Sequence, residues 1–320
     1  MFFKKNKPEK NIDSSKEEVS PSRKWLRWFS HLGMDPIHLL VGHDLIAIAD
    51  PKQNGLLPSE IDKLRGKMTE DVGLIFPNVR IMDYTCIEKN EYLISIRGVS
   101  VCKNHLENTD QDTPELNDKI IKDLRKSVIL HADKLIDHTY VRRLLELLRT
   151  QEADVELVAE LVPDQLSISS IQRILTNLVT EEVCIRDVLY LFDRLLDFSQ
   201  YEQKPDLLSE KIRHALRLAI SSQHSEKENK PLSEVWEKRL SEKLIEANYG
   251  YALDLDSETK FELISEIRTL SAPVLVCSSK IRLPLARVLL DAGFEITVLA
   301  SDEIVPVIAC PRHFVIPDSR

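Results

Sequence analysis

Apolar residues recur at helical spacing through the centre of the chain. Residues 161–187 read LVPDQLSISSIQRILTNLVTEEVCIRD, and four apolar positions fall at i, i+3, i+4 and i+7: Ile171, Ile174, Leu175 and Leu178. This pattern predicts an amphipathic helix, and Ser169 followed by Gln172 predicts a capping box at its start. Asp187 is the predicted N-cap of a second helix, whose apolar face comprises Val188, Leu191, Phe192, Leu195 and Leu196.

Further helices are expected on both sides of this pair. The preceding helix has one apolar face, formed by Val141, Leu144, Leu145 and Leu148. Asp206 is the predicted N-cap of the following helix, whose apolar face comprises Leu208, Ile212, Ala215, Leu216 and Ala219. The charged stretch 221–230, SSQHSEKENK, is expected to be a linker. Residues 138–222 therefore form a predicted helical domain.

Shorter apolar runs before this region predict mixed α/β structure. Strands are expected at Leu45–Ala49, Val79–Met82 and Tyr92–Val101, because each run is apolar and bounded by polar or turn residues. A helix is expected at Pro58–Val72, with Gly73 closing its C-terminus. Residues 35–137 are therefore predicted to form a small mixed α/β domain.

The end of the chain has a strand–helix–strand pattern. Val274–Cys277 and Phe294–Leu299 are expected strands around a helix at Leu283–Ala292, which Gly293 closes. A connection of this length joins parallel strands. The predicted fold class is therefore α+β and multidomain: an arm at 1–34, a small mixed α/β domain at 35–137, a helical middle domain at 138–222 and a C-terminal α/β domain at 223–320 with a parallel βαβ crossover.

Charge separates the arm from the rest of the chain. The net charge is −9, yet residues 1–34 carry eight basic and four acidic residues, so the acidic excess lies beyond them. The beginning of the arm is polar and without periodicity, which predicts a disordered linker. Further along, Trp25, Trp28 and Phe29 alternate with basic residues in a short amphipathic pattern. We expect these three side chains to dock on a protein surface, of this chain or a neighbour, because so short a segment binds membranes weakly.

Residues suited to catalysis or metal binding each fit a structural role better. The five cysteines include no C-x-x-C pair, which argues against a disulfide framework and a thiolate zinc site. Cys277 lies at an expected strand-to-helix turn, but a cysteine phosphatase loop needs an arginine six residues later and Arg282 comes one position early. Arg186 and Asp187 are interpreted as an ion-pair residue and a helix cap in preference to an acid/base pair. We expect no catalytic residue, no cofactor and no metal site.

Three further classes are disfavoured. The acidic body of the chain argues against nucleic-acid binding, which needs a basic stripe. No apolar run reaches the roughly 18 residues of a membrane span, and the first residues lack the apolar core of a signal peptide. We expect no membrane span in this chain and a reduced, cytoplasmic setting.

A composite motif covers the central segment: Leu161, Val162, Pro163, Leu166, Ile171, Gln172, Leu175, Asn177, Leu178, Ile185, Arg186 and Asp187. It resembles the cytoplasmic domain of the FHIPEP family, the export-gate proteins of flagella and type III secretion systems. Three other blocks resemble the family in the same order: VGHDLIAIAD at 41–50, EYLISIRGVSV at 91–101, and APVLVCSSKIRLPLARVLL at 272–290 followed by ITVLASDEI at 296–304. The resemblance extends over most of the chain.

The resemblance implies a non-enzymatic component of a protein export apparatus, flagellar or of an injectisome, at the cytoplasmic face of the bacterial inner membrane. It would form a homo-oligomeric ring and contact other export proteins, with Gln172, Arg173, Arg186 and Asp187 at subunit or partner interfaces. The transmembrane half of the family is expected to be absent. A short bridge replaces the family's extra α/β module after Val101, which argues against chaperone–cargo docking. The alternative is a free-standing soluble adaptor or regulator derived from an export gate.

Overall fold

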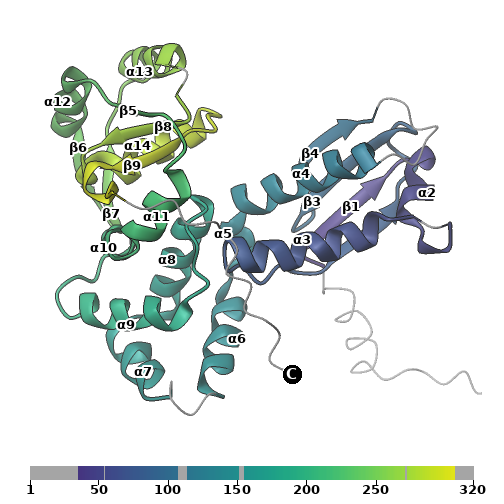
Figure 1. Ribbon diagram of the computed structural model, residues 1–320, viewed down its shortest axis with the longest axis horizontal. Helices are drawn as coiled ribbons and strands as arrows, with labels where there is room; N and C mark the ends of the chain where they lie inside the picture. The colour runs from purple at the N-terminus through teal and green to yellow at the C-terminus, as the bar shows by residue number, and fades with distance from the viewer. Residues whose placement is uncertain (1–34, 54, 107–113, 151–154, 271, 307–320) are drawn as a thin grey trace, which may run out of the picture. The chain divides into compact units, whose positions relative to one another are not determined.

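A four-stranded sheet begins the described part of the chain. Its strands β1 (Ile37–Val41), β2 (Val79–Asp83), β3 (Glu91–Ile96) and β4 (Val99–His105) lie in the order β2-β1-β3-β4 (Figure 1). The β1–β2 pair is parallel and the other two pairs are antiparallel.

The computed structural model describes residues 35–53, 55–106, 114–150, 155–270 and 272–306. The predicted aromatic segment with Trp25, Trp28 and Phe29 lies outside these ranges.

Helices α3 (Leu57–Asp71) and α4 (Pro114–Leu130) pack with this sheet around one core. The core-facing side chains of α3 recur at helical spacing and are buried: Leu57, Ile61, Leu64 and Met68. Val72 ends the helix, and Gly73 follows with φ +81°, a left-handed conformation that glycine adopts without strain. The predicted helix and its closing glycine are confirmed.

The strand predicted at Leu45–Ala49 is wrong. The residues form a 3₁₀ turn, η1 (His43–Leu45), and a short helix, α2 (Ile46–Ala49), and strand β1 lies earlier in the sequence. The chain turns at Gly42, whose amide donates to the Glu91 carbonyl at 2.8 Å. A Cβ at position 42 would lie 2.2 Å from the Glu88 carbonyl oxygen, so only glycine fits this turn. The next 3₁₀ turn is η2 (Pro51–Gln53).

The single strand predicted at Tyr92–Val101 is two strands, β3 and β4, joined as a hairpin. Arg97 and Gly98 connect them with φ values of +51° and +80°. Two consecutive positive φ values are the requirement of a type I′ hairpin turn, which matches the twist of the flanking strands. Gly98 was the sequence signal for this turn, and the apolar residues on either side concealed it.

The middle of the chain is helical, as predicted. Its elements are α5 (Ala132–Leu135), α6 (His138–Arg149), α7 (Val155–Ala159), the turn η3 (Glu160–Gln165), α8 (Ile168–Thr180), α9 (Val188–Ser199), α10 (Pro205–Ala215) and α11 (Arg217–His224). The four predicted core residues of α8 are all 0% exposed: Ile171, Ile174, Leu175 and Leu178. Asp187 is confirmed as the N-cap of α9, since its Oδ1 accepts from the Tyr190 amide at 3.1 Å.

The capping box predicted from Ser169 and Gln172 is wrong. Helix α8 begins at Ile168, and Ser167 is its N-cap, because the Ser167 hydroxyl accepts from the Ser170 amide at 3.0 Å. Ser169 lies inside the helix with its hydroxyl 3.1 Å from His138 Nε2. Serines at three neighbouring positions made the start of this helix ambiguous in the sequence.

We call residues 229–306 the C-terminal module. It contains β5 (Asn229–Pro231), α12 (Glu234–Glu242), β6 (Leu244–Ala247), β7 (Gly250–Leu253), α13 (Ser257–Leu270), β8 (Val274–Cys277), α14 (Ser279–Asp291), β9 (Thr297–Ala300) and η4 (Ser301–Glu303). Strands β5, β8 and β9 form a parallel sheet in that order, and β6 and β7 form a hairpin (Figure 1). The predicted parallel crossover β8–α14–β9 and the predicted fold class are confirmed.

The linker predicted at 221–230 is wrong at both ends. Helix α11 continues to His224, and Asn229–Pro231 is strand β5, paired with β8. Lys230 donates from Nζ to the Leu270 carbonyl at 2.9 Å, which holds this polar strand against the module.

The buried apolar residues form two clusters, one from Ile37 to Ile220 with Val274 and Leu299, the other within 232–298. The domain boundaries expected from the sequence stay predictions.

Candidate functional site

The C-terminal module meets helices α8 and α10 through two clusters of charged side chains. The enclosed cluster comprises Glu181, Glu210, Arg213, Arg282 and Glu303. The rim cluster comprises Arg173, Asn177, Asp206 and Arg287. Each cluster joins residues from the helical region to residues of α14 or η4. The charged junction is the strongest chemical feature of the described chain, so we treat it as the candidate functional site.

Arg282 on α14 is the centre of the enclosed cluster and its side chain is only 1% exposed. Its Nη1 donates to Glu181 Oε2 at 2.9 Å and to the Val298 carbonyl at 3.3 Å, and its Nε donates to Glu210 Oε2 at 2.6 Å. Burial opposes the charge of Arg282, but Glu181 and Glu210 outweigh it and raise the pKa of the guanidinium above its usual value. Arg282 therefore stays charged inside the fold.

Arg213 on α10 makes the second half of this cluster, with a side chain 2% exposed. It binds Glu303 in a bidentate pair, with Nε to Oε1 at 2.6 Å and Nη2 to Oε2 at 2.9 Å. Its Nη1 donates to Glu181 Oε2 at 2.7 Å, so Glu181 accepts from both buried arginines. Burial opposes ionisation of Glu303, but Arg213 outweighs it and lowers the pKa of the carboxyl.

Asp206 is the centre of the rim cluster, and this corrects the predicted N-cap role. Helix α10 begins at Pro205, so Asp206 lies in its first turn, and its side chain is 4% exposed. Arg173 donates to its two oxygens at 2.8 and 3.1 Å, and Arg287 at 2.7 and 2.9 Å. Burial opposes ionisation, but hydrogen bonds from Arg287 and Arg173 outweigh it and lower the Asp206 pKa to about 2.

The hairpin of β6 and β7 closes the rim cluster. The Asp206 amide donates to the Tyr249 carbonyl at 2.9 Å, and the Arg173 guanidinium lies 4.0 Å from the centroid of the Tyr249 ring. A Cβ at Gly250 would lie 2.7 Å from Asp206 Cβ. Glycine at this position therefore allows the hairpin to approach the carboxylate that the two arginines bind.

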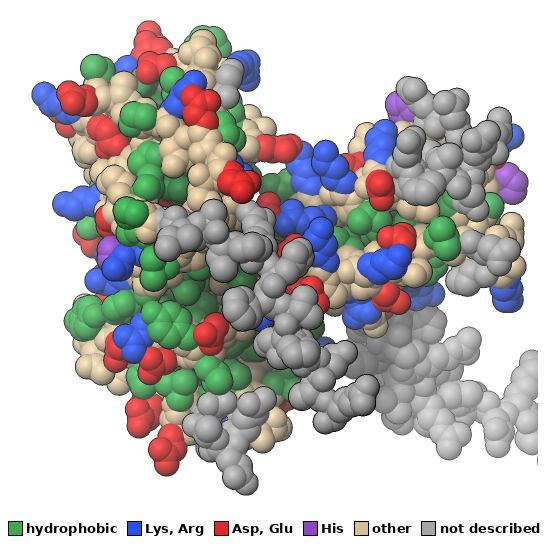
Figure 2. All heavy atoms as spheres, in the orientation of Figure 1, with side chains coloured by type: hydrophobic (Ala, Val, Ile, Leu, Met, Phe, Trp, Pro, Cys, Tyr) green, Lys and Arg blue, Asp and Glu red, His purple; other side chains and the backbone are tan. Residues whose placement is uncertain are grey.

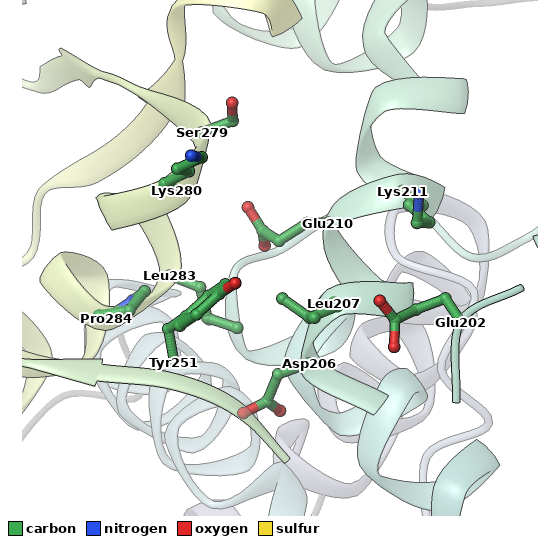
Figure 3. Close-up of a pocket in the computed structure, with 10 residues that line it drawn as sticks. All are labelled: Glu202, Asp206, Leu207, Glu210, Lys211, Tyr251, Ser279, Lys280, Leu283 and Pro284. Atoms are coloured by element: carbon green, nitrogen blue, oxygen red, sulfur yellow. The ribbon is translucent and has the colours of Figure 1, made fainter. Parts of the chain in front are cut away.

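A pocket of about 260 Å³ lies beside the junction, between α10, β7 and α14. Figure 3 shows Leu207 on α10 facing Tyr251 on β7 and Leu283 on α14, with Pro284 next to them. Ser279 and Lys280 come from the first turn of α14, and Lys211 from the next part of α10. The pocket has an apolar floor and polar groups at its edge.

The start of α14 is already occupied by a carboxylate. Glu237 accepts from the Ser278 amide and from the Ser278 hydroxyl, both at 2.9 Å. Cys277 is 2% exposed, and burial raises the pKa of its thiol, so the thiol stays protonated. The sequence-based interpretation of Cys277 as a buried structural cysteine agrees with this geometry. Among the described residues, no group of three or more His, Cys, Asp or Glu side chains is placed to hold a metal ion.

The structure separates the four residues expected at an interface. Arg173 lies at the rim cluster, and Gln172 is its half-buried neighbour on α8. Arg186 and Asp187 are exposed in the loop before α9, which contacts the end of α3 through the Ile185 amide and the Val72 carbonyl at 2.8 Å. Their interface role stays a prediction. The sequence reasoning missed Arg213 and Arg287. Arg287 is a basic residue within an apolar helical run, but Arg213 lies among polar residues and gave no such signal.

This chain is similar to known proteins over most of its length. The model of the FHIPEP family matches residues 2–112 and 103–309. The flagellar biosynthesis protein FlhA of Bacillus subtilis is 26% identical over 328 residues, which cover 85% of this chain and 48% of that protein. The chain spans about half the length of the curated relatives it matches.

Two solved structures share the fold. The Chlamydia pneumoniae CdsV protein superposes with a TM-score of 0.71 at 19% identity, covering 85% of this chain and 94% of CdsV. The nonameric EPEC SctV-C superposes with a TM-score of 0.70 at 21% identity, covering 85% of this chain and 95% of SctV-C. Within the described residues, no helix is both long enough and apolar enough to cross a membrane. With a family model that matches most of its length, this chain belongs to the FHIPEP family.

Proposed function

We propose that this protein is a non-enzymatic component of a type III protein export apparatus, flagellar or of an injectisome, and acts as part of the cytoplasmic ring of the export gate. The observation that carries the proposal is the family match together with the fold shared with SctV-C, which is a nonamer. The protein acts at the cytoplasmic face of the bacterial inner membrane, where the transmembrane part of an export gate would lie.

The absence of catalysis is supported by the way the reactive groups are used. Cys277 is buried and protonated, Glu237 occupies the start of α14, and Arg282 is bound by two carboxylates. A nucleophile needs a positioned base and access to substrate, and Cys277 has neither. These contacts support a structural role for the junction, which holds parts of the protein together.

Subunit contacts are proposed on the helical region. Leu147 on α6, Tyr190 on α9 and Leu218 on α11 are 55%, 40% and 63% exposed. Figure 2 shows hydrophobic side chains gathering over α9. Large exposed apolar patches on soluble proteins mark interaction sites. The exposed pair Arg186 and Asp187 and the half-exposed Gln172 and Arg173 are proposed to add polar contacts to a neighbouring subunit or partner.

The arm at 1–34 is proposed to clasp an adjacent subunit, because it is basic and the remainder of the chain is acidic. Trp25, Trp28 and Phe29 supply the apolar part of this contact. Other export-apparatus proteins are the expected partners. Chaperone–cargo docking is not part of the proposal, since the bridge after Val101 is shorter than the module that performs it in the family.

The alternative function is a free-standing adaptor or regulator that binds export components without forming the gate. Size-exclusion chromatography with light scattering separates the two. A large species that grows with protein concentration supports the ring, and a monomer at every concentration tested would exclude it. A variant with Leu147, Tyr190 and Leu218 changed to Ser tests the proposed contact surface. It removes the exposed apolar side chains and leaves the buried core unchanged.

A further inference from the structure

The pocket between α10, β7 and α14 is small for a ligand site. Small-molecule sites in proteins usually measure about 300–1,000 Å³, and this pocket measures about 260 Å³. Its floor is formed by Leu207, Leu283, Pro284 and the ring of Tyr251 (Figure 3). One aromatic or large aliphatic side chain of a partner fills such a space.

The carboxylates at the pocket are already bound to other groups of this chain. Asp206 is held by Arg173 and Arg287, and Glu210 is held by Arg282. Glu202 Oε1 accepts from the amides of Gln203 and Lys204, both at 2.9 Å. The arginines that bind Asp206 and Glu210 therefore offset these two negative charges, while Glu202 is held only by backbone amides among the described residues and keeps its charge.

The two lysines at the pocket are not neutralised in this way. Among the ion pairs formed by the described residues, none includes Lys211 or Lys280. Lys211 Nζ lies 5.2 Å from the centroid of the Tyr201 ring, a contact that leaves its charge available, and Lys280 is exposed in the first turn of α14. Two lysines and one carboxylate, Glu202, therefore line the pocket without an ion pair among the described residues, and their summed charge is positive.

Helix α14 lacks one internal hydrogen bond at the pocket. Pro284 lies inside α14 and has no amide hydrogen to donate to the Lys280 carbonyl four residues earlier. Both residues line the pocket. A polypeptide segment carries amide donors of the kind that Pro284 lacks.

We propose that this pocket is a docking site for an acidic segment of a partner polypeptide, which inserts one aromatic or large aliphatic side chain and places one carboxylate beside Lys211 and another beside Lys280. The site goes beyond ring formation and does not depend on it. Because the pocket is bounded by α10 on one side and by the C-terminal module on the other, its occupant contacts both.

Short capped peptides test this on the full chain. Leu207 and Leu283 carry methyl groups at the pocket, so their methyl NMR signals report occupancy directly. Ac-Asp-Phe-Glu-NH₂ is expected to shift these signals saturably, with a Kd in the range of about 1 mM that such a small ligand allows. Ac-Lys-Phe-Lys-NH₂ and Ac-Asp-Ala-Glu-NH₂ are expected to bind at least about tenfold more weakly, because they lack the charge and the apolar anchor respectively.

Charge reversal gives the matched comparison. The double variant Lys211→Glu with Lys280→Glu is expected to weaken the acidic peptide at least about tenfold, while Lys238→Glu, at an exposed site on α12, leaves binding unchanged. Added salt is expected to weaken binding to the wild type and not to the double variant. Equal binding of the acidic and basic peptides, or no saturable methyl shift up to about 10 mM peptide, would overturn the proposal whether or not the protein forms rings.

Discussion

Arg282 Nη1 donates to Glu181 Oε2 at 2.9 Å, and this pair links residues that are 101 positions apart in the sequence. Glu181 is the C-cap of α8, and Arg282 lies on α14 of the C-terminal module. A buried ion pair does little for net stability compared with apolar residues, but it tolerates the loss of one partner poorly. The pair therefore fixes where α14 lies on α8.

Arg282→Ala is expected to lower the free energy of unfolding by about 3–5 kcal/mol, because it leaves the Glu210 carboxylate without its partner inside the fold and leaves Glu181 with Arg213 alone. Chemical denaturation monitored by circular dichroism measures the change. The control is Arg142→Ala, at an exposed position on α6, which should stay within roughly 0.5 kcal/mol of wild type. Equal stability of the two variants would contradict the enclosed cluster.

The loss of unfolding free energy at acid pH should reflect the titration of Asp206. Its folded pKa of about 2 lies below the usual 3.8, so the carboxylate contributes stability that is present above pH 3.8 and is lost as the pH falls through 2. Because a pKa difference of one between the folded and unfolded states is worth about 1.4 kcal/mol, the ionised Asp206 contributes roughly 2 kcal/mol.

Asp206→Asn keeps the shape of the side chain and removes the titration. The free energy of unfolding of the wild type and the variant, measured between pH 6 and pH 2, should differ most at pH 6 and converge towards pH 2. Subtraction of the two curves removes the titration of other acids, including Glu303. Parallel curves over the whole range would show that the two arginines do not stabilise the ionised Asp206.

Leu175 in the core of α8 is 0% exposed, so Leu175→Ala should cost about 2–5 kcal/mol through lost burial and the cavity left behind. Arg173, two positions earlier, lies on the polar face of the helix and would be expected from the sequence to tolerate truncation. The structure changes that expectation, because Arg173 binds the buried Asp206 through two hydrogen bonds.

Arg173→Ala is now expected to cost about 1.5–3 kcal/mol, the range for hydrogen bonds to charged groups. Arg186→Ala, at an exposed position whose side chain is not needed for the α9 cap, serves as the neutral reference within roughly 0.5 kcal/mol. The melting temperatures of the Leu175→Ala, Arg173→Ala and Arg186→Ala proteins rank the three variants by stability. A Leu175→Ala protein that melts with the wild type would disprove the packing of α8.

Self-association should depend on salt and on the arm. At 1 M ionic strength the Debye length is about 3 Å, so an electrostatic clasp by the basic arm weakens while the apolar contacts of Trp25, Trp28 and Phe29 persist. Sedimentation velocity of the full chain and of a chain lacking residues 1–34, at low and high salt, measures both contributions. Identical self-association of the two proteins under both conditions would show that the arm is only a linker.

The sequence predicts the parts of this fold that local spacing controls. The buried face of α8, the Asp187 cap and the parallel crossover β8–α14–β9 each depend on residues close together in the chain. The enclosed cluster depends on residues that are far apart in the chain. Arg213 lies in the polar stretch SEKIRHA, and its burial depends on Glu181 and Glu303, which lie 32 and 90 positions away. Local patterns carry no signal for partners at such separations.

The close approach of Gly250 to Asp206 links two positions that otherwise have little in common. Any side chain at 250 would begin 2.7 Å from Asp206 Cβ, closer than two carbon atoms can lie without one of them moving. Every residue except glycine carries a Cβ at position 206, so the close approach requires glycine at 250 whichever side chain stands at 206. Among relatives that keep this hairpin, we therefore expect residue 250 to stay glycine even where residue 206 is not acidic.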